Sequence, residues 1–443
     1  MASTAAWSLG FGMPHANPRW PSRDRLDSGP DAGTANPFDL PEGAPLKPEQ
    51  ARGLDSLREA LAAEPGVRSA EVRAVLSPYR VCPIGAHVDH QHGPVLGMAI
   101  DRGTGLAFAP AEGRGCRIRS ANYAGRAEFD LDAPGEPADS GWERYPRAAA
   151  WALRGRLPAR PRGVLAAIDG ALPGGGLSSS ASLLLGCLTA LAHANEVELT
   201  PEELVRLSFD AENGYVGLKS GVLDPAAIVA SREGRLACID TAAVGWESLA
   251  LGAEAPAWRV VVAFSGQSRN LTGTGFNRRV EECGEAARWV AERAGLAPVG
   301  RLGDLPEAVL AEEFDAIPGA PGRRARHFVE ERVRVREGAA CWQAGDLEGF
   351  GARMTDSCRS SIENFETGSE ELVALHRALE AAGVYGSRFS GAGFAGCAVG
   401  LVAADRAEAC RAAVEADYAR AFPARAADAS VFLAESDDGV RIV

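Results

Sequence analysis

The chain has 443 residues, of which 46% are hydrophobic and 24% are charged, and its formal net charge is −13 at pH 7. This composition predicts a globular protein of two or three domains, and the apolar runs are too short and interrupted for a membrane-spanning helix. The acidic balance argues against a dedicated nucleic-acid binder, because phosphate contacts need a basic face.

Residues 1–45 are rich in Pro, Gly, Ser, Asp and Ala and show no hydrophobic periodicity. Such a segment buries too little apolar surface to order itself, so we expect a disordered extension. A transit peptide is the alternative, since arginines and serines occur together here, but several aspartates count against it.

Helices are predicted from helical spacing of apolar residues and from capping signals. The clearest start is Thr200, a candidate N-cap that is followed by Pro201 and by Glu203, which completes a capping box. Beyond residue 265 the chain is mostly helical as far as Gly383. The remaining helices are predicted over residues 49–63 and 179–195.

Strands are predicted from short apolar or alternating runs on both sides of the helical stretch. Mixed strands and helices without an internal repeat indicate the α/β (α+β) class. We place a domain boundary near residue 250, which gives an extension (1–45), an N-terminal domain (46–250) and a C-terminal domain (251–443). The predicted strands cover residues 71–76, 106–110, 117–120, 163–169, 237–240, 258–265, 397–402 and 430–435.

The strongest chemical signal is the segment 173–181 (PGGGLSSSA), between an apolar strand and an apolar helix. Glycines let the backbone approach a ligand closely, and the N–H groups at a helix N-terminus attract anions. A plain glycine turn with serine caps is the structural alternative, and the Walker A pattern is absent from the sequence. The predicted polyphosphate site comprises Gly174, Gly175, Gly176, Leu177, Ser178, Ser179, Ser180 and Ala181.

This segment resembles the ATP loop of the GHMP kinases, and of their galactokinase branch in particular. The resemblance covers about residues 68–435, and it implies ATP and Mg²⁺ as cofactors. It also implies a two-domain fold, with an N-terminal domain like ribosomal protein S5 and a ferredoxin-like C-terminal domain. Residues 385–397 (YGSRFSGAGFAGC) are similar to a second galactokinase motif, which implies that Gly391 and Gly393 bind ATP.

Residues 77–90 (SPYRVCPIGAHVDH) are similar to the galactokinase sugar signature. The resemblance implies that Arg80 lies beside the catalytic aspartate, and that His87 and Asp89 bind sugar hydroxyls. A carboxylate suits this role because it accepts directional hydrogen bonds.

Residues 212–224 (ENGYVGLKSGVLD) are similar to the family stretch between the metal-binding Glu and the catalytic Asp. The resemblance implies that Glu212 and Ser180 hold Mg²⁺. It further implies that Asp224 accepts or orients the anomeric hydroxyl proton, and that Gly221 contacts the substrate. Pro225 departs from the family pattern, which has Gln at this position.

Ala86 is the most informative departure, because galactokinases carry a Glu there that contacts the sugar's 6-hydroxyl. At ~4 Å, two like charges repel by about 4 kcal/mol at an effective dielectric of 20, so a Glu would oppose a sugar carboxylate. The stretch around Ala86 also resembles plant galacturonokinases. Lys219 is a candidate partner for the carboxylate, and the alternative is an exposed loop lysine.

These matches predict a sugar 1-kinase that transfers the ATP γ-phosphate to the anomeric hydroxyl of D-galacturonic acid. A galactokinase or an arabinokinase is the alternative within the enzyme class. A non-catalytic sugar-sensing regulator is a third possibility, which the intact Glu212 and Asp224 disfavour. We expect a sugar acid and ATP as partners, no nucleic acid or membrane, and a monomer or weak dimer. Scattered cysteines without a C-x-x-C pair fit a reducing, cytoplasmic location.

Overall fold

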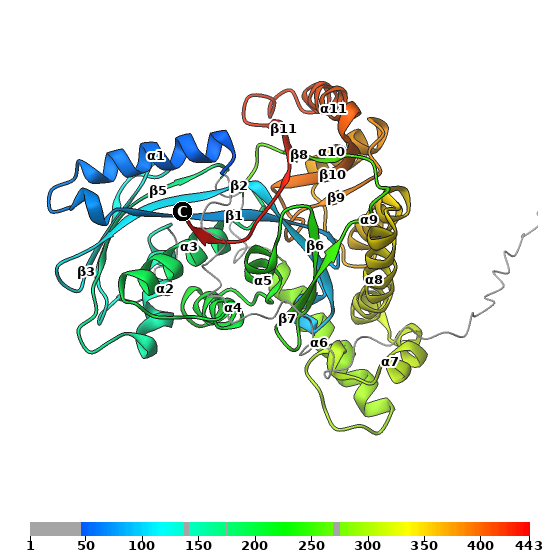
Figure 1. Ribbon diagram of the computed structural model, residues 1–443. Helices are drawn as coiled ribbons and strands as arrows, with labels where there is room; N and C mark the ends of the chain where they lie inside the picture. The colour runs from blue at the N-terminus through cyan, green and yellow to red at the C-terminus, as the bar shows by residue number, and fades with distance from the viewer. Residues whose placement is uncertain (1–45, 137–140, 173–174, 269–274) are drawn as a thin grey trace, which may run out of the picture. The chain divides into compact units, whose positions relative to one another are not determined.

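The computed structural model describes residues 46–136, 141–172, 175–268 and 275–443 (Figure 1). The predicted extension 1–45 and Gly174 lie outside these residues. The described residues all belong to one compact unit. No helix in them combines the length and the apolar character needed to cross a membrane.

The larger of two sheets has nine strands in the described residues, and its main path runs β13-β1-β2-β5-β3-β4. β6 and β12 pair with β2, and β7 pairs with β6. All pairs are antiparallel except β3 with β5. The strands are β1 (Arg73–Ile84), β2 (Val95–Pro110), β3 (Gly115–Ser120), β4 (Arg126–Asp130), β5 (Val164–Gly170), β6 (Arg235–Asp240), β7 (Gly245–Ala250), β12 (Ser436–Asp437) and β13 (Arg441–Ile442).

Helices cover both faces of this sheet. Successive residues of a strand point to opposite sides, so neighbouring residues of β1 pack into different cores. Ala74 and Leu76 of β1 pack with Leu54 and Leu57 on one face. Val75, between them, belongs to the core on the other face. The helices are α1 (Pro48–Ala62) on the first face, and α2 (Arg144–Leu153), α3 (Ser179–Ala194), α4 (Pro201–Asp210) and α5 (Leu223–Ala230), which contribute to the second core.

The smaller sheet has the order β11-β8-β10-β9 in the part of the chain described. Its strands are β8 (Trp258–Phe264), β9 (Gly386–Phe389), β10 (Cys397–Ala403) and β11 (Ser430–Ala434). The helices between and after them are α6 (Phe276–Arg293), α7 (Glu307–Glu313), α8 (Gly319–Ala344), α9 (Leu347–Glu363), α10 (Glu370–Ala381) and α11 (Ala407–Ala421).

One hydrophobic core joins the two sheets. It contains Val81 and Ile84 of β1, Val262 of β8, and Trp342 and Phe350 from α8 and α9. The inner end of β1 is therefore fixed by both halves of the chain. The loop that follows β1 begins where these two halves meet.

The sequence located most elements, and the differences have local causes. The capping box is confirmed: Thr200 Oγ1 accepts from Glu203 N at 3.2 Å, and Glu203 Oε2 accepts from Thr200 N at 2.9 Å. The predicted strand 71–76 is too short, because β1 continues to Ile84. From Ala74 onward β1 is buried throughout and the sheet register shifts at Pro78, so the expected alternation is lost.

Candidate active site

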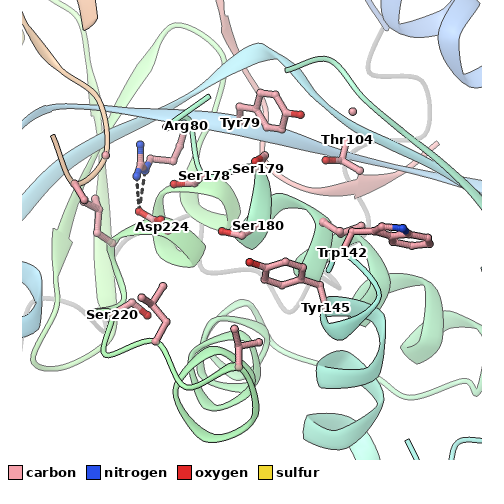
Figure 2. A pocket seen from close by; sticks show the side chains of 18 of the residues that line it. Tyr79, Arg80, Thr104, Trp142, Tyr145, Ser178, Ser179, Ser180, Ser220 and Asp224 are labelled. Carbon is pink, nitrogen blue, oxygen red and sulfur yellow. Dashed lines mark hydrogen bonds and ion pairs between the residues drawn. The ribbon is translucent and has the colours of Figure 1, made fainter. Parts of the chain in front are cut away.

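A cavity of about 640 Å³ lies beside the ends of β1, α3 and α5 (Figure 2). It brings together residues from every motif that the sequence singled out. Of the predicted site residues, the cavity is lined by Arg80, Ala86, His87, Asp89, Gly176, Ser178, Ser179, Ser180, Gly221, Asp224 and Gly391.

The glycine–serine segment turns sharply into α3. Gly176 has φ 77° and Ser178 has φ 59°, both left-handed, and the helix begins at Ser179. The Ser178 hydroxyl is buried without a hydrogen-bond partner in the described residues. A buried unpaired hydroxyl at a helix N-terminus, beside a cavity, fits a site for an anionic group.

The second glycine motif packs directly on the first. A Cβ at Gly391 would lie 2.8 Å from the Gly176 carbonyl oxygen, so only glycine fits this approach. Gly391 thus shapes the wall of the glycine–serine turn. Gly393 does not line the cavity, and a Cβ there would lie 3.0 Å from Thr367 Oγ1.

Arg80 and Asp224 form an ion pair at the cavity wall (Figure 2). Arg80 Nε and Nη2 donate to Asp224 Oδ1 at 2.9 and 2.7 Å, and Nη1 donates to Ser390 Oγ at 3.2 Å. The Arg80 side chain is 3% exposed, and that of Asp224 is 26% exposed. The guanidinium is therefore fixed, while the carboxylate still reaches the cavity.

Asp89 is a partly buried carboxylate held against the start of α5. Its Oδ2 accepts from Leu223 N at 3.3 Å, and a Cβ at Gly221 would lie 2.1 Å from that oxygen. Burial, with the nearby Asp224 charge, raises the pKa of Asp89 to about 6. A ligand that donates hydrogen bonds would favour the ionised form.

His87 has φ 65° and stacks on Phe365, with 4.4 Å between the ring centroids. Its Nε2 is buried without a hydrogen-bond partner in the described part of the chain. Burial lowers the pKa of His87 well below its usual value, so the ring is neutral at pH 7. His87 is therefore available for a hydrogen bond to an uncharged polar group.

Glu212 lies in the π-helical turn Ala211–Val216 that follows α4. Its Oε2 accepts from Ser220 Oγ at 3.0 Å, and Ser180 also bonds to its side chain. Burial, and then the Asp224 charge, raise the pKa of Glu212 to about 7. Figure 2 shows the hydroxyl groups of Tyr145 and Ser180 near one another, and the two side chains are hydrogen bonded. A carboxylate and a hydroxyl beside an anion site are oxygen donors of the kind that Mg²⁺ prefers.

Lys219 lies outside the cavity lining. Its side chain is 60% exposed and pairs with Glu281 at 3.6 Å. Leu177, Ala181, Gly175 and Glu212 also do not line the cavity. The first two are core residues, and Glu212 is buried.

Several lining residues were not predicted as site residues. The pair Trp142 and Tyr145 at the start of α2 had a weak sequence signal, the W-x-x-Y spacing. Asn122 and Tyr123, after β3, had none. Asn122 Nδ2 donates to Asp169 Oδ1 at 3.0 Å and its Oδ1 accepts from Gly170 N at 2.7 Å, which fixes this turn to β5.

Protein-family models match three parts of the chain. "GHMP kinases N terminal domain" matches residues 144–232, "GHMP kinases C terminal" matches residues 339–420, and "Galactokinase galactose-binding signature" matches residues 66–110. The matched ranges contain Asp224, Gly391 and Asp89 respectively.

Curated relatives agree with these models. The chain is 36% identical to a galacturonokinase of Arabidopsis thaliana, over 88% of this chain and 98% of the relative. It is 34% identical to a galactokinase of Chloroflexus aggregans, over 78% and 88% respectively. The crystal structure of Lactococcus lactis galactokinase complexed with galactose superposes with a TM-score of 0.79 at 30% identity, covering 88% of this chain and 99% of that one.

Proposed function

The chain belongs to the GHMP kinase family, and from this membership we propose that it transfers the γ-phosphate of ATP to the anomeric hydroxyl of D-galacturonic acid. The product is α-D-galacturonate 1-phosphate. The similarity to a galacturonokinase and to galactokinases makes the chain a sugar kinase of that type. The choice of galacturonic acid is the finer part of the proposal.

The glycine–serine segment holds the ATP phosphates in this proposal. The left-handed turn at Gly176 and Ser178, the unpaired Ser178 hydroxyl and the α3 N-terminus support this placement. Gly391 stabilises the turn from the opposite side.

Asp224 accepts or orients the proton of the anomeric hydroxyl, and two hydrogen bonds from Arg80 hold that carboxylate in place. The Arg80 charge also stabilises the negative charge on the transferring phosphoryl group. The fixed guanidinium and the partly exposed carboxylate support this division of roles.

Mg²⁺ fits the oxygen donors of Glu212 and Ser180, since such sites use one or two carboxylates together with substrate phosphates. When bound there, the metal would supply positive charge beside the ATP phosphates. Ser220 holds Glu212 in place at 3.0 Å. A bound cation would also favour the ionised form of Glu212, whose pKa burial raises to about 7.

The single observation behind the substrate choice is Ala86. It lines the cavity next to His87, three residues before Asp89, where galactokinases carry a Glu. A glutamate here would repel a C6 carboxylate by about 4 kcal/mol at ~4 Å and an effective dielectric of 20. The small uncharged side chain removes this repulsion and leaves room for the second oxygen.

The direct test measures ATP-dependent phosphorylation with galacturonate, galactose, arabinose and glucuronate at equal concentrations. We expect the highest kcat/KM for galacturonate. A higher kcat/KM for galactose would replace the proposal with galactokinase activity, the second candidate that the 34% identical relative favours. ATP and sugar binding without turnover would indicate a sensor instead.

A further inference from the structure

Helix α8 contacts the loop that carries the predicted sugar-binding residues, called here the 85–89 loop. His327 and Glu331 lie one helical turn apart on α8, and both are 0% exposed. Each bonds to the backbone of the loop, at Ala86 and Gly85 respectively. Neither residue lines the cavity.

His327 holds the carbonyl of Ala86. Its Nε2 lies 2.9 Å from the Ala86 carbonyl oxygen and its Nδ1 lies 2.9 Å from Ser360 Oγ. A carbonyl only accepts, so Nε2 carries the proton and Nδ1 accepts from the Ser360 hydroxyl. Burial lowers the pKa of His327 to about 4, which leaves the ring neutral and this tautomer fixed at pH 7.

Glu331 holds the amide of Gly85. Its Oε1 accepts from Gly85 N at 2.7 Å and from the Ser357 hydroxyl, and its Oε2 accepts from Arg334 Nε at 2.6 Å. Arg388 of β9, also buried, lies 3.8 Å from Oε1. A buried carboxylate is stable only when its charge is paired, and here two arginines do so.

The loop needs this support because its backbone is strained at His87. Gly85 has φ 101° and His87 has φ 65°, and a left-handed conformation is unfavourable for a histidine. A strained conformation persists when contacts with the surrounding structure hold it in place. The hydrogen bonds to Gly85 N and to the Ala86 carbonyl oxygen flank the peptide bond between these two residues and supply that restraint.

We propose that His327 and Glu331 are positioning residues that set the affinity for the sugar by fixing the Gly85–Ala86 backbone. This inference rests on the proposed sugar site, but it does not depend on which galacto-configured sugar is used. Neither residue touches the substrate. Their effect reaches it through the placement of Ala86, His87 and Asp89.

The test is a KM comparison on the full chain, with the sugar that the wild type phosphorylates fastest. His327→Phe keeps a ring but removes the donor to Ala86, and we expect KM for the sugar to rise about tenfold or more while KM for ATP changes by less than about twofold. His327→Gln restores a donor and should recover most of the loss. Glu337→Gln, at a 48% exposed position of the same helix, is the matched control and should change neither constant.

An equal rise in both KM values, or a His327→Gln variant as impaired as His327→Phe, would overturn the proposal. If His327→Phe does not fold, Ser360→Ala carries the test, because it removes the hydroxyl that fixes the His327 tautomer. We then expect a rise of about threefold in sugar KM alone, and sugar KM equal to that of Glu337→Gln would contradict the proposal. A wild type that prefers galactose would refute the galacturonate proposal without affecting this comparison.

Discussion

Arg80 donates two hydrogen bonds to a single oxygen of Asp224, at 2.9 and 2.7 Å, and so leaves the second carboxylate oxygen for the substrate. Asp224→Asn keeps the shape but removes the charge that accepts a proton. We expect kcat to fall by about 10²–10⁴-fold, with ATP affinity near that of the wild type. Steady-state kinetics and calorimetric nucleotide titration measure the two quantities.

The exposed Asp210, changed to Asn, is the control for this substitution and should retain full turnover. Near-normal kcat in Asp224→Asn would remove Asp224 from the catalytic role.

Ala86→Glu tests the basis of substrate choice. The new charge repels the galacturonate carboxylate and can accept a hydrogen bond from the 6-hydroxyl of galactose. We expect the ratio of kcat/KM for galacturonate over galactose to fall at least about tenfold, the equivalent of ~1.4 kcal/mol.

Ala86→Gln has nearly the same size without the charge, and it should lower that ratio much less. Equal losses on both sugars in the two variants would mean that residue 86 acts through space filling alone.

Gly221→Ala tests the contact between the 85–89 loop and the start of α5. The added Cβ would lie 2.1 Å from Asp89 Oδ2 and 2.7 Å from His90 N, so Asp89 must move. We expect sugar KM to rise about tenfold or more, with a smaller change in KM for ATP. Gly245→Ala meets no atom within 4 Å and serves as the control. Unchanged sugar KM in Gly221→Ala would show that Asp89 does not need this position.

Glu212→Gln should raise the stability of the protein at high pH and lower its kinase activity. The pKa of Glu212 is raised from 4.5 to about 7 in the folded protein, mainly by burial. The folded state therefore binds this proton more tightly than the unfolded state. The stability that this proton contributes is fully present below pH 4.5 and is lost as the pH rises through 7. In the absence of ligand and metal, the variant should be more stable than the wild type by about 1–3 kcal/mol at pH 8, with little difference at pH 4.5.

Urea unfolding at both pH values measures this difference, and kinase activity should fall at the same time. Glu247→Gln changes an exposed glutamate and should shift stability by less than about 0.5 kcal/mol at either pH. A destabilised Glu212→Gln at pH 8 would mean that the charge is paired rather than strained.

Local signals in the sequence were sufficient for much of the fold. The apolar run after Ser179 predicted α3 to within a residue at each end, and the capping box at Thr200 predicted the start of α4. The sequence predicted β2 only in part. It missed the strands β4, β7, β9, β12 and β13 and the helices α2, α5 and α11. β2 is buried along most of its length, so polar alternation does not mark its start at Val95.

The residues of the candidate site show the same difference between local motifs and contacts over long sequence distances. Arg80, Asp89 and Asp224 lie in motifs, and the structure brings them to one cavity. His327 is 241 residues from Ala86, and no local pattern indicates that they are bonded. Lys219 was proposed from its distance to Asp224 along the chain, but the loop turns its side chain toward Glu281.

The pairing of β13 with β1 affects the order in which the chain can fold during synthesis. Val75 and Leu76 pair with Ile442 and Arg441, and β12 pairs with β2 further along. The edge of β1 at Val75 and Leu76 therefore stays open until residues 441–442 have been made, after every strand of the smaller sheet. An open strand edge is a template for intermolecular pairing. Until translation reaches β13, this short edge is therefore open to such pairing.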